Sequence, residues 1–472
     1  MECPAASAGL FLFNVIESIR RHTFMDSCDT LLLKDNLTDT GKTILAKNSD
    51  RPLGEAQPLC FYEGTDDKFA VIGSRPYWMD GFEMGANEKG VFIGNEAEGS
   101  RMPQETEEGM LGMDMLRTAL ETAPDALSAV NVISELLSKY GQNKNAHPSL
   151  DRRYENTFII TDPHEAYVME TAGREWAAKK ITDYAAVSNC YQIGSDYDLC
   201  SPEMENTVIK NRWLRPGEKT DFAKAFTKPA DRQRNSVPRM RRMIKLTDGI
   251  LANGKPGCSD IRQILRDHFE GEINCPRYGA IYGGFTTICM HALTDAIDSC
   301  QTAASMIMTY DDTFRYKFLW APGVPCLSLY IPVYWINPGK KPCRIPECMS
   351  RGGKLYDPES LWWTMERLSV LTGMDEERFG LPVRESLKKL EKGIDKMTLD
   401  AEEEAAEMIE CGNLTGAQRR LYVLTEQASE TLLNTAGMLT AVLSMEILKS
   451  GGLYGPRKEI IESYMARTEM PL

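Results

Sequence analysis

The pattern of apolar and polar positions predicts a β-hairpin that begins at Cys28. Two short apolar runs, residues 28–33 and 43–48, flank the turn-forming segment D-N-L-T-D-T-G. Centring the turn near Thr38 makes the numbers of paired residues sum to about 76, so Cys28 should lie opposite Asn48 or close to it. The polar segment K-N-S-D-R, which starts at the end of the second run, is therefore predicted to lie beside Cys28.

Strands and helices are predicted in alternating groups along the rest of the body. Further strands are predicted at residues 69–73, 82–85, 91–95, 157–161, 165–171, 176–181, 184–189, 285–291, 304–309, 316–320 and 326–333. Apolar residues at helical spacing predict helices at residues 111–122, 126–140, 232–246 and 260–268. Groups of strands separated by paired helices are typical of a layered α+β body rather than of alternating βαβ units.

The two ends of the chain differ from this body, which we place at residues 28–336. Residues 1–27 are interpreted as a propeptide or as a mis-called extension upstream of Met25, and neither alternative is favoured. Residues 337–357 are rich in glycine, proline and lysine and are predicted to form a linker. Residues 358–472 are almost wholly helical in pattern and highly charged, and this extension would pack on the body or form a subunit interface of a homo-oligomer.

Composition and charge narrow the class of protein. The chain has 42% hydrophobic and 26% charged residues, as an ordinary globular protein does, and its net charge is −14. Nucleic acids and anionic membranes need a basic face, so neither is expected as a partner. The longest apolar stretch, near residues 438–448, is too short and interrupted to cross a bilayer, so no membrane span is expected.

Cysteine and histidine usage points to a reducing compartment and away from a metal site. The thirteen cysteines include no C-x-x-C pair, which favours free thiols and a cytoplasmic location. None of the five histidines is spaced like a metal ligand, and neither H-E-x-x-H nor G-x-S-x-G occurs. Nothing in the sequence points to serine–histidine or cysteine–histidine catalysis.

Nine short motifs, in their order and spacing, resemble the secernin branch of the dipeptidase family, within the N-terminal nucleophile hydrolases. They are C-D-T (28–30), A-K-N-S-D-R-P (46–52), S-R-P-Y-W (74–78), E-M-G-A-N-E-K-G-V-F-I-G-N-E-A (83–97), L-G-M-D-M-L-R-T-A-L-E (111–121), V-M-E-T-A-G-R-E-W-A-A (168–178), V-S-N (187–189), I-L-R-D (264–267) and F-T-T (285–287). The resemblance covers residues 28–333. It implies a four-layer αββα sandwich, an N-terminal cysteine exposed by processing, hydrolysis of small amide bonds, and no cofactor or metal.

Cys28 is the predicted nucleophile, although a lone cysteine at the start of a strand is usually a small buried apolar residue. If Cys28 were the first residue, its α-amine, with a pKa of about 7.7–8.0, would accept the thiol proton near neutral pH. No histidine would then be needed. Asp50 is predicted to hold the α-ammonium by a charge-assisted hydrogen bond, the alternative being a turn carboxylate.

Four further residues have a candidate role and a structural alternative. Asn95 is either a turn former or an amide donor to the oxyanion of a tetrahedral intermediate. Asn189 resembles the second asparagine that the family keeps near the nucleophile. Lys47 stands where the dipeptidases carry arginine, but lysine lacks the bidentate fork of arginine. Arg51 could replace that function, or it could be a solvated neighbour on the opposite face.

An active-site arginine is also expected near the start of the helix predicted at 232–246. Arg234 lies about where related acylases keep one, Arg232 competes for the role, and a solvated helix face is an equal alternative for both. The sequence thus predicts a cysteine-type amide hydrolase, by default a dipeptidase acting on short peptides. The alternatives are an N-acyl amide acylase and a non-catalytic, secernin-like interaction protein. Activity would require cleavage of the Ser27–Cys28 bond, by attack of the Cys28 thiol on the Ser27 carbonyl.

Overall fold

Two antiparallel β-sheets form the centre of the computed structural model, which describes residues 27–215, 217–229, 236–272, 287–292, 299–337, 344–455 and 457–472. In this part of the chain the first sheet has the order β10 (Tyr184–Ser188), β1 (Asp29–Leu33), β2 (Ile44–Pro52), β12 (Cys300–Asp311), β13 (Arg315–Pro322), β14 (Ile331–Trp335). The second has the order β11 (Leu199–Cys200), β9 (Glu175–Lys180), β8 (Ala166–Ala172), β7 (Glu155–Thr161), β6 (Phe92–Glu98), β5 (Met84–Asn87), β4 (Val71–Ser74), β3 (Leu59–Tyr62).

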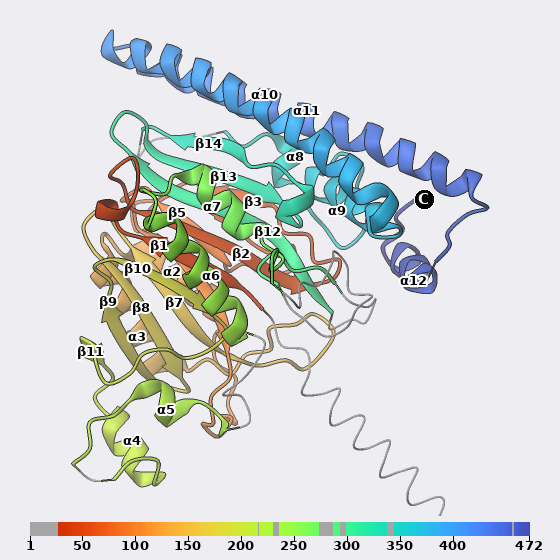
Figure 1. The fold of residues 1–472 in the computed structure, drawn as a ribbon. Coiled ribbons are helices and arrows are strands. Elements are labelled where there is room, and N and C mark those ends of the chain that lie inside the picture. Colours follow the sequence, from red (N-terminus) through yellow and green to blue (C-terminus); the bar gives the residue numbers. More distant parts are fainter. Residues whose placement is uncertain are drawn as a thin grey trace, which may run out of the picture.

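Alternation along the strands separates the buried faces of the sheets. On β1, Leu32 contributes to the core between the sheets, whereas Leu31 and Leu33 point outward to helices α6 (Ser236–Leu251) and α7 (Cys258–Leu265). The outer face of the second sheet packs against α2 (Gly112–Thr122) and α3 (Ala126–Tyr140). The order of layers is therefore helices, sheet, sheet, helices (Figure 1), which confirms the predicted αββα sandwich. Two short helices, α4 (Met204–Lys210) and α5 (Phe222–Phe226), follow β11.

The C-terminal helices pack directly on the first sheet. They are α8 (Glu347–Ser350), α9 (Leu361–Thr372), α10 (Glu376–Glu410), α11 (Leu414–Lys449) and α12 (Lys458–Thr468). Figure 1 shows α10 and α11 as one long hairpin beside β14. The indole nitrogen of Trp362 donates to the carbonyl of Ala303 in β12 at 2.7 Å, and the Thr425 hydroxyl donates to the carbonyl of Pro332 in β14 at 2.7 Å. The helices thereby extend the central core, and the predicted domain boundaries stay predictions.

Helix α11 has the length and hydropathy of a membrane span, with a mean hydropathy of 1.4 in its most apolar window, of which 33% is buried inside the protein. Its inner face, including Leu432 and Ala436, belongs to the central core. Met438, Val442 and Met445 lie on its exposed side. A homo-oligomer formed through this extension and the absence of a membrane span both stay predictions.

Two local predictions differ from the structure, and the predicted hairpin register is close to it. The strand predicted at 285–291 is irregular over its described part, residues 287–291, where bonds from the side chains of Asn48 and Thr302 and two isolated main-chain bonds take the place of a ladder. The strand predicted at 326–333 begins as the 3₁₀ helix η4 (Pro325–Leu327), because Pro325 at its first position cannot donate to a sheet. The hairpin pairs Asp29 with Asn48, so the partner of Asn48 is one residue further along the chain than Cys28, within the stated closeness of the prediction.

The buried carboxyl of Glu366 on α9 makes the attachment of the C-terminal helices sensitive to pH. It accepts hydrogen bonds from Tyr464 on α12 at 2.7 Å and from Gln301 on β12 at 2.6 Å. Burial raises its pKa to about 7, against the opposing effect of these two donors. The neutral carboxyl therefore stabilises the fold fully below its ordinary pKa of 4.5, and this contribution is lost as the pH rises through about 7.

We expect Glu366→Gln to remove most of that loss, which is about 3 kcal/mol at 1.36 kcal/mol per pKa unit. Thermal unfolding at acidic, neutral and alkaline pH measures the effect, and the variant should gain over the wild type only on the alkaline side. The exposed Glu377→Gln on α10 is the matched control and should leave the pH profile unchanged. Parallel profiles for wild type and Glu366→Gln would contradict this explanation.

Candidate active site

Cys28 immediately precedes β1 and contacts residues of both neighbouring chain segments, at the end of β10 and in β2. Its main-chain nitrogen donates to Oδ1 of Asn189, the residue after β10, at 2.8 Å. Its Sγ accepts from the main-chain nitrogen of Asp50 in β2 at 3.3 Å. Because β1 pairs with β10 on one side and β2 on the other, the hairpin register and the β10 pairing together bring these three residues into contact. Cys28 is only 3% exposed.

A buried cation and a buried carboxyl lie on the inner face of the sheets beside Cys28. Lys47 Nζ is 3.6 Å from Glu96 Oε2 of β6 and donates to the Asn95 carbonyl, while the Thr30 hydroxyl donates to Glu96. Burial raises the pKa of Glu96 to about 7, despite the opposing effect of Lys47 and Thr30. Burial also raises the pKa of the Cys28 thiol well above its ordinary value, and the positive charge of Lys47 offsets part of that rise.

The side chain of Asp50 points to the outer face of the sheet, as strand alternation requires. It accepts hydrogen bonds from the hydroxyls of Ser27 at 3.0 Å and of Thr302 on β12 at 2.7 Å. Burial raises the pKa of this carboxyl well above its ordinary value, Arg239 opposes that rise, and Asp29 adds to it. The structure thus brings Asp50 to both residues of the Ser27–Cys28 bond.

Arg239 of α6 is the arginine that the structure brings to this site. It pairs with Asp29 at 3.2 Å and donates to Asn189 Oδ1 and to the Ser188 hydroxyl, each at 2.8 Å. The predicted candidates Arg232 and Arg234 lie outside the described residues. Helical spacing contained the signal, since Arg239 stands four residues before the buried Met243 and so shares its face. The signal was obscured by the several arginines in the segment.

Two predicted residues, Asn95 and Arg51, lie beside Glu83, whose negative charge adds to the raised pKa of Cys28. The side-chain amide of Asn95 lies between Asn156 and Glu83, at 3.0 Å from each, on the face of β6 covered by α2. Glu96 takes the opposite face, so only the carbonyl of Asn95 reaches the network around Cys28. The oxyanion function of Asn95 stays a prediction from sequence.

Arg51 is a buried member of another polar network and is not a solvated residue. Its guanidinium bonds Glu55 at 3.0 Å, Glu83 at 3.3 Å and the Tyr154 hydroxyl at 3.3 Å. It shares the inner face of β2 with Lys47, because the two residues are four positions apart on one strand. The expectation that Arg51 faces solvent is therefore wrong. Its guanidinium also donates to the Ala146 carbonyl at 3.1 Å, and together these contacts link β2 to the residues before β7.

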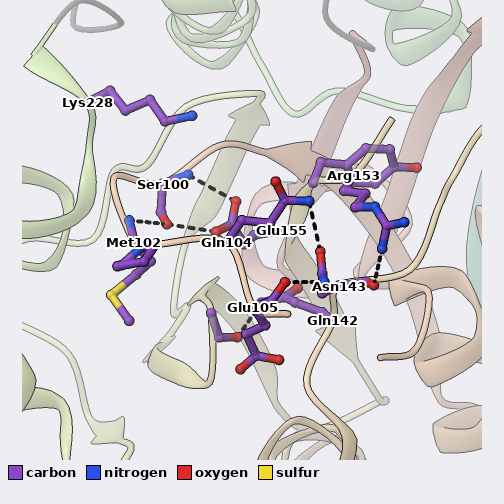
Figure 2. Close-up of a pocket in the computed structure, with 12 residues that line it drawn as sticks. Ser100, Met102, Gln104, Glu105, Gln142, Asn143, Arg153, Glu155 and Lys228 are labelled. Carbon is purple, nitrogen blue, oxygen red and sulfur yellow. Dashed lines mark hydrogen bonds between the residues drawn. The ribbon is translucent and has the colours of Figure 1, made fainter. Parts of the chain in front are cut away.

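A polar pocket of about 140 Å³ lies beyond this network, at the ends of β6 and β7. Figure 2 shows Ser100 and Lys228 on the left, Arg153 on the right and Gln104 between them. Ser100 is bonded to Glu155 at 2.7 Å. Tyr154 both lines the pocket and contacts Arg51, but none of the residues bonded to Cys28 lines it. We therefore assign it no catalytic function.

A group of potential metal ligands lies on the other side of Asp50, contrary to the expectation from histidine spacing. It consists of His268, Cys289, His291 and Cys326. Only the C-M-H run is local, and the other two residues join it through tertiary packing. A short Cys-x-His spacing was the one signal that sequence analysis could have used.

Comparison with solved structures finds distant likenesses. No protein-family model matches the chain. It is similar to a mutant of the conjugated bile acid hydrolase from Clostridium perfringens, with a TM-score of 0.35 and 15% identity over 62% of this chain and 88% of that one. It is also similar to the N-acylethanolamine-hydrolyzing acid amidase ortholog of Caenorhabditis elegans, with a TM-score of 0.32 and 10% identity over 60% and 92%. TM-scores this low carry no argument about function, which therefore rests on the site geometry.

The buried position and raised pKa of Cys28 predict slow alkylation in the full chain. Thiolates are the reactive form, so iodoacetamide at about pH 7.5 should modify Cys28 at least about tenfold more slowly than exposed Cys411. Lys47→Met should slow it further, since the cation that opposes the rise in pKa is lost. Mass spectrometry of peptides measures both rates. Equal rates for Cys28 and Cys411 would contradict the described environment.

Proposed function

We propose that this protein is a cysteine-type amide hydrolase whose nucleophile is Cys28 at the N-terminus of a processed chain. The observation that carries the proposal is the pair of contacts made by one residue. The nitrogen of Cys28 is held by Asn189 at 2.8 Å, and its Sγ faces the main-chain N–H of Asp50 at 3.3 Å. The peptide nitrogen that processing would turn into an α-amine and the thiol of the same residue are thereby both held in place, with no histidine contact to Cys28 among the described residues.

The α-amine released by processing would act as the base. With a reference pKa of about 7.7–8.0 it accepts the Sγ proton near neutral pH, while Asn189 keeps its orientation. Sγ then attacks the substrate carbonyl, the α-ammonium protonates the leaving amine, and water hydrolyses the resulting thioester. Lys47 supplies a buried positive charge that favours the thiolate. Asp50 would hold the ammonium by a charge-assisted hydrogen bond.

Processing uses the same groups. The Cys28 thiol attacks the Ser27 carbonyl, the peptide nitrogen leaves as the new α-amine, and water opens the Ser27–Cys28 thioester to a carboxylate and a free thiol. The Ser27 hydroxyl is bonded to Oδ2 of Asp50, so departure of Ser27 removes one donor from this carboxyl. The new α-ammonium would take over that position. It would also lower the pKa of Asp50, which burial raises in the uncleaved chain.

A short peptide is the proposed substrate class, and a dipeptide is the default, on the resemblance of the nine sequence motifs alone. An N-acyl amide is the alternative substrate for the same chemistry. A cytoplasmic location is proposed because all ten cysteines in the described residues are free. The competing function is a non-catalytic interaction protein, which would keep the fold without processing or turnover.

A chain encoded as Met followed directly by Cys28 should be active once methionine is removed. Wild-type full-length protein should reach the same specific activity only in the fraction that intact mass shows to begin at Cys28. Cys28→Ala should be folded, uncleaved and inert, because it lacks the nucleophile for both reactions. Cys60→Ser is the matched control and should be processed normally.

A panel of dipeptides and N-acyl amides tests turnover in the same preparations. Hydrolysis of acyl amides but not of dipeptides would replace the dipeptidase proposal with the acylase one. No hydrolysis by either full-length protein or the chain that begins at Cys28 would overturn the enzyme proposal and leave the interaction protein.

Asn189→Ala should reduce kcat/KM of the chain that begins at Cys28 by about 10²-fold or more, because the base loses its orientation. The acidic limb of the pH profile of kcat/KM should shift in this variant, because the side chain that contacts the amine is missing. Asn87→Ala is the matched control, as Asn87 is equally buried and donates to Leu120 and Ala123 away from Cys28. Equal losses of activity in both variants would mean that Asn189 is merely structural.

A further inference from the structure

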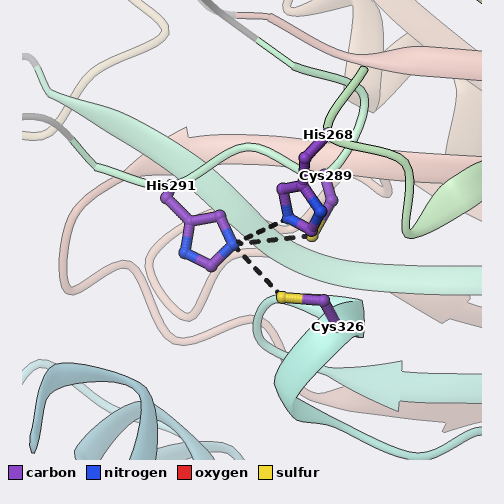
Figure 3. A group of neighbouring side chains, drawn as sticks. All are labelled: His268, Cys289, His291 and Cys326. Atoms are coloured by element: carbon purple, nitrogen blue, oxygen red, sulfur yellow. Dashed lines mark hydrogen bonds between the residues drawn. The ribbon is translucent and has the colours of Figure 1, made fainter. Parts of the chain in front are cut away.

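Four side chains from three separate segments converge between the first sheet and the C-terminal helices. His268 follows α7, Cys289 and His291 lie in the irregular segment 287–292, and Cys326 lies in η4. Their ligand atoms all lie within 4.8 Å of one another. Figure 3 shows both imidazole rings and both sulfurs directed toward a common centre. The cluster shares no residue with the contacts of Cys28.

The distances from His291 Nε2 to the other three donor atoms are close to the edges of a tetrahedral centre. The two Nε2 atoms are 3.2 Å apart, and His291 Nε2 is 3.2 Å from the sulfur of Cys326 and 3.8 Å from that of Cys289. Zinc–nitrogen bonds of about 2.0–2.1 Å and zinc–sulfur bonds of about 2.3 Å give tetrahedral edges of about 3.3 Å between nitrogens and about 3.6 Å between nitrogen and sulfur. The donor atoms are therefore already placed around a volume of the size of one ion.

A carboxylate orients one ligand from behind. His268 Nδ1 is 3.1 Å from Oε1 of Glu270, and the other oxygen of Glu270 accepts from the His268 main-chain nitrogen at 2.7 Å. A proton on Nδ1 leaves the lone pair of Nε2 directed into the cluster. Metal-binding histidines generally have such a partner, which fixes both the tautomer and the ring orientation. The contact between His268 and Glu270 therefore has the form expected behind a metal-binding histidine.

We propose that His268, Cys289, His291 and Cys326 bind one zinc ion in a closed, four-coordinate structural site. Two thiolates and two imidazoles are a donor set that zinc occupies in tetrahedral geometry. Four protein ligands leave no open position for substrate, so the site is structural rather than catalytic. His291 also lines a small pocket of about 40 Å³ next to α9 and α12.

The site would anchor the segment that supports Asp50. Met290, between two of the ligands, exchanges main-chain and side-chain hydrogen bonds with Thr302, at 3.1 and 3.0 Å. The hydroxyl of Thr302 in turn donates to Asp50 at 2.7 Å. The amide of Asn48 donates to Leu265 and Ile288, each at 2.8 Å, and so joins the end of α7 to the same segment. The metal would replace the sheet ladder that these residues lack.

Metal analysis of the full chain tests the site without any assay of activity. Protein expressed with added zinc and purified without chelator should contain close to one zinc per chain by inductively coupled plasma mass spectrometry. Cobalt(II) bound to the metal-free protein should give the visible bands of tetrahedral cobalt and a thiolate charge-transfer band in the near ultraviolet. Cys326→Ser should reduce zinc content at least about tenfold, whereas the matched control Cys348→Ser, a half-buried cysteine of α8, should keep it.

Glu270→Gln keeps all four ligands, so it tests the site even if the ligand variants fail to fold. It should weaken zinc binding by about 10–100-fold, because the orienting carboxylate is lost, while the circular dichroism spectrum stays that of the wild type. Wild-type protein that binds neither zinc nor cobalt after thiol reduction would overturn the proposal. A Cys289–Cys326 disulfide in protein freshly isolated from cells would also overturn it. Equal zinc contents in Cys326→Ser and Cys348→Ser would overturn it too. None of these results depends on the proposed hydrolase activity.

Discussion

The hydrogen bond from the Cys28 nitrogen to Asn189 is the interaction on which the account of this protein depends. It exists because β1 is paired on both sides, to β10 and to β2, so the residue before β1 has no freedom to turn away. The same pairing puts the main-chain N–H of Asp50 on the sulfur. A displacement of β1 by one residue would exchange the inner and outer faces and remove the thiol from Lys47.

Buried charge around this bond is the second constraint. Lys47 and Glu96 lie on the inner side of the first sheet, and Asp29 and Arg239 lie on its outer side, all at most 1% exposed. Replacing such pairs by apolar residues is often neutral or stabilising, whereas removal of one partner costs about 3–5 kcal/mol. A contribution to folding stability therefore explains poorly why two buried ion pairs lie next to the Cys28 thiol. They are well explained by a site that must hold charge away from water.

Local sequence signals, such as capping and turn residues, were sufficient to predict the elements whose limits they set. Helix α3 has the predicted bounds because Asp125 caps its first turn and Gly141 ends it with a positive φ of 68°. The hairpin of β1 and β2, and with it the approach of Asp50 to Cys28, followed from turn residues between two apolar runs. The layered α+β body followed from the grouping of strands and helices, and the αββα order from the resemblance.

Features created by tertiary packing could not be predicted in this way. Arg239 reaches Asn189 only because α6 lies across β10 and β1, and its helical spacing to Met243 does not by itself show which of the neighbouring arginines enters the site. Which side of the sheet the Asn95 side chain takes depends on which face of β6 is covered by α2. Cys326 joins His268 because η4 replaces the start of the predicted strand, which brings the cysteine over the end of α7.

Trapping of the acyl-enzyme is the most direct test of the central claim, that Cys28 provides both nucleophile and base. The chain that begins at Cys28 would be mixed with an amide substrate, quenched in acid during turnover and digested for mass spectrometry. The account predicts the acyl mass on the N-terminal peptide, as a thioester on Sγ that hydroxylamine removes. Turnover with the acyl group on another residue, or undiminished turnover by a chain in which Cys28 is replaced by alanine, would contradict it.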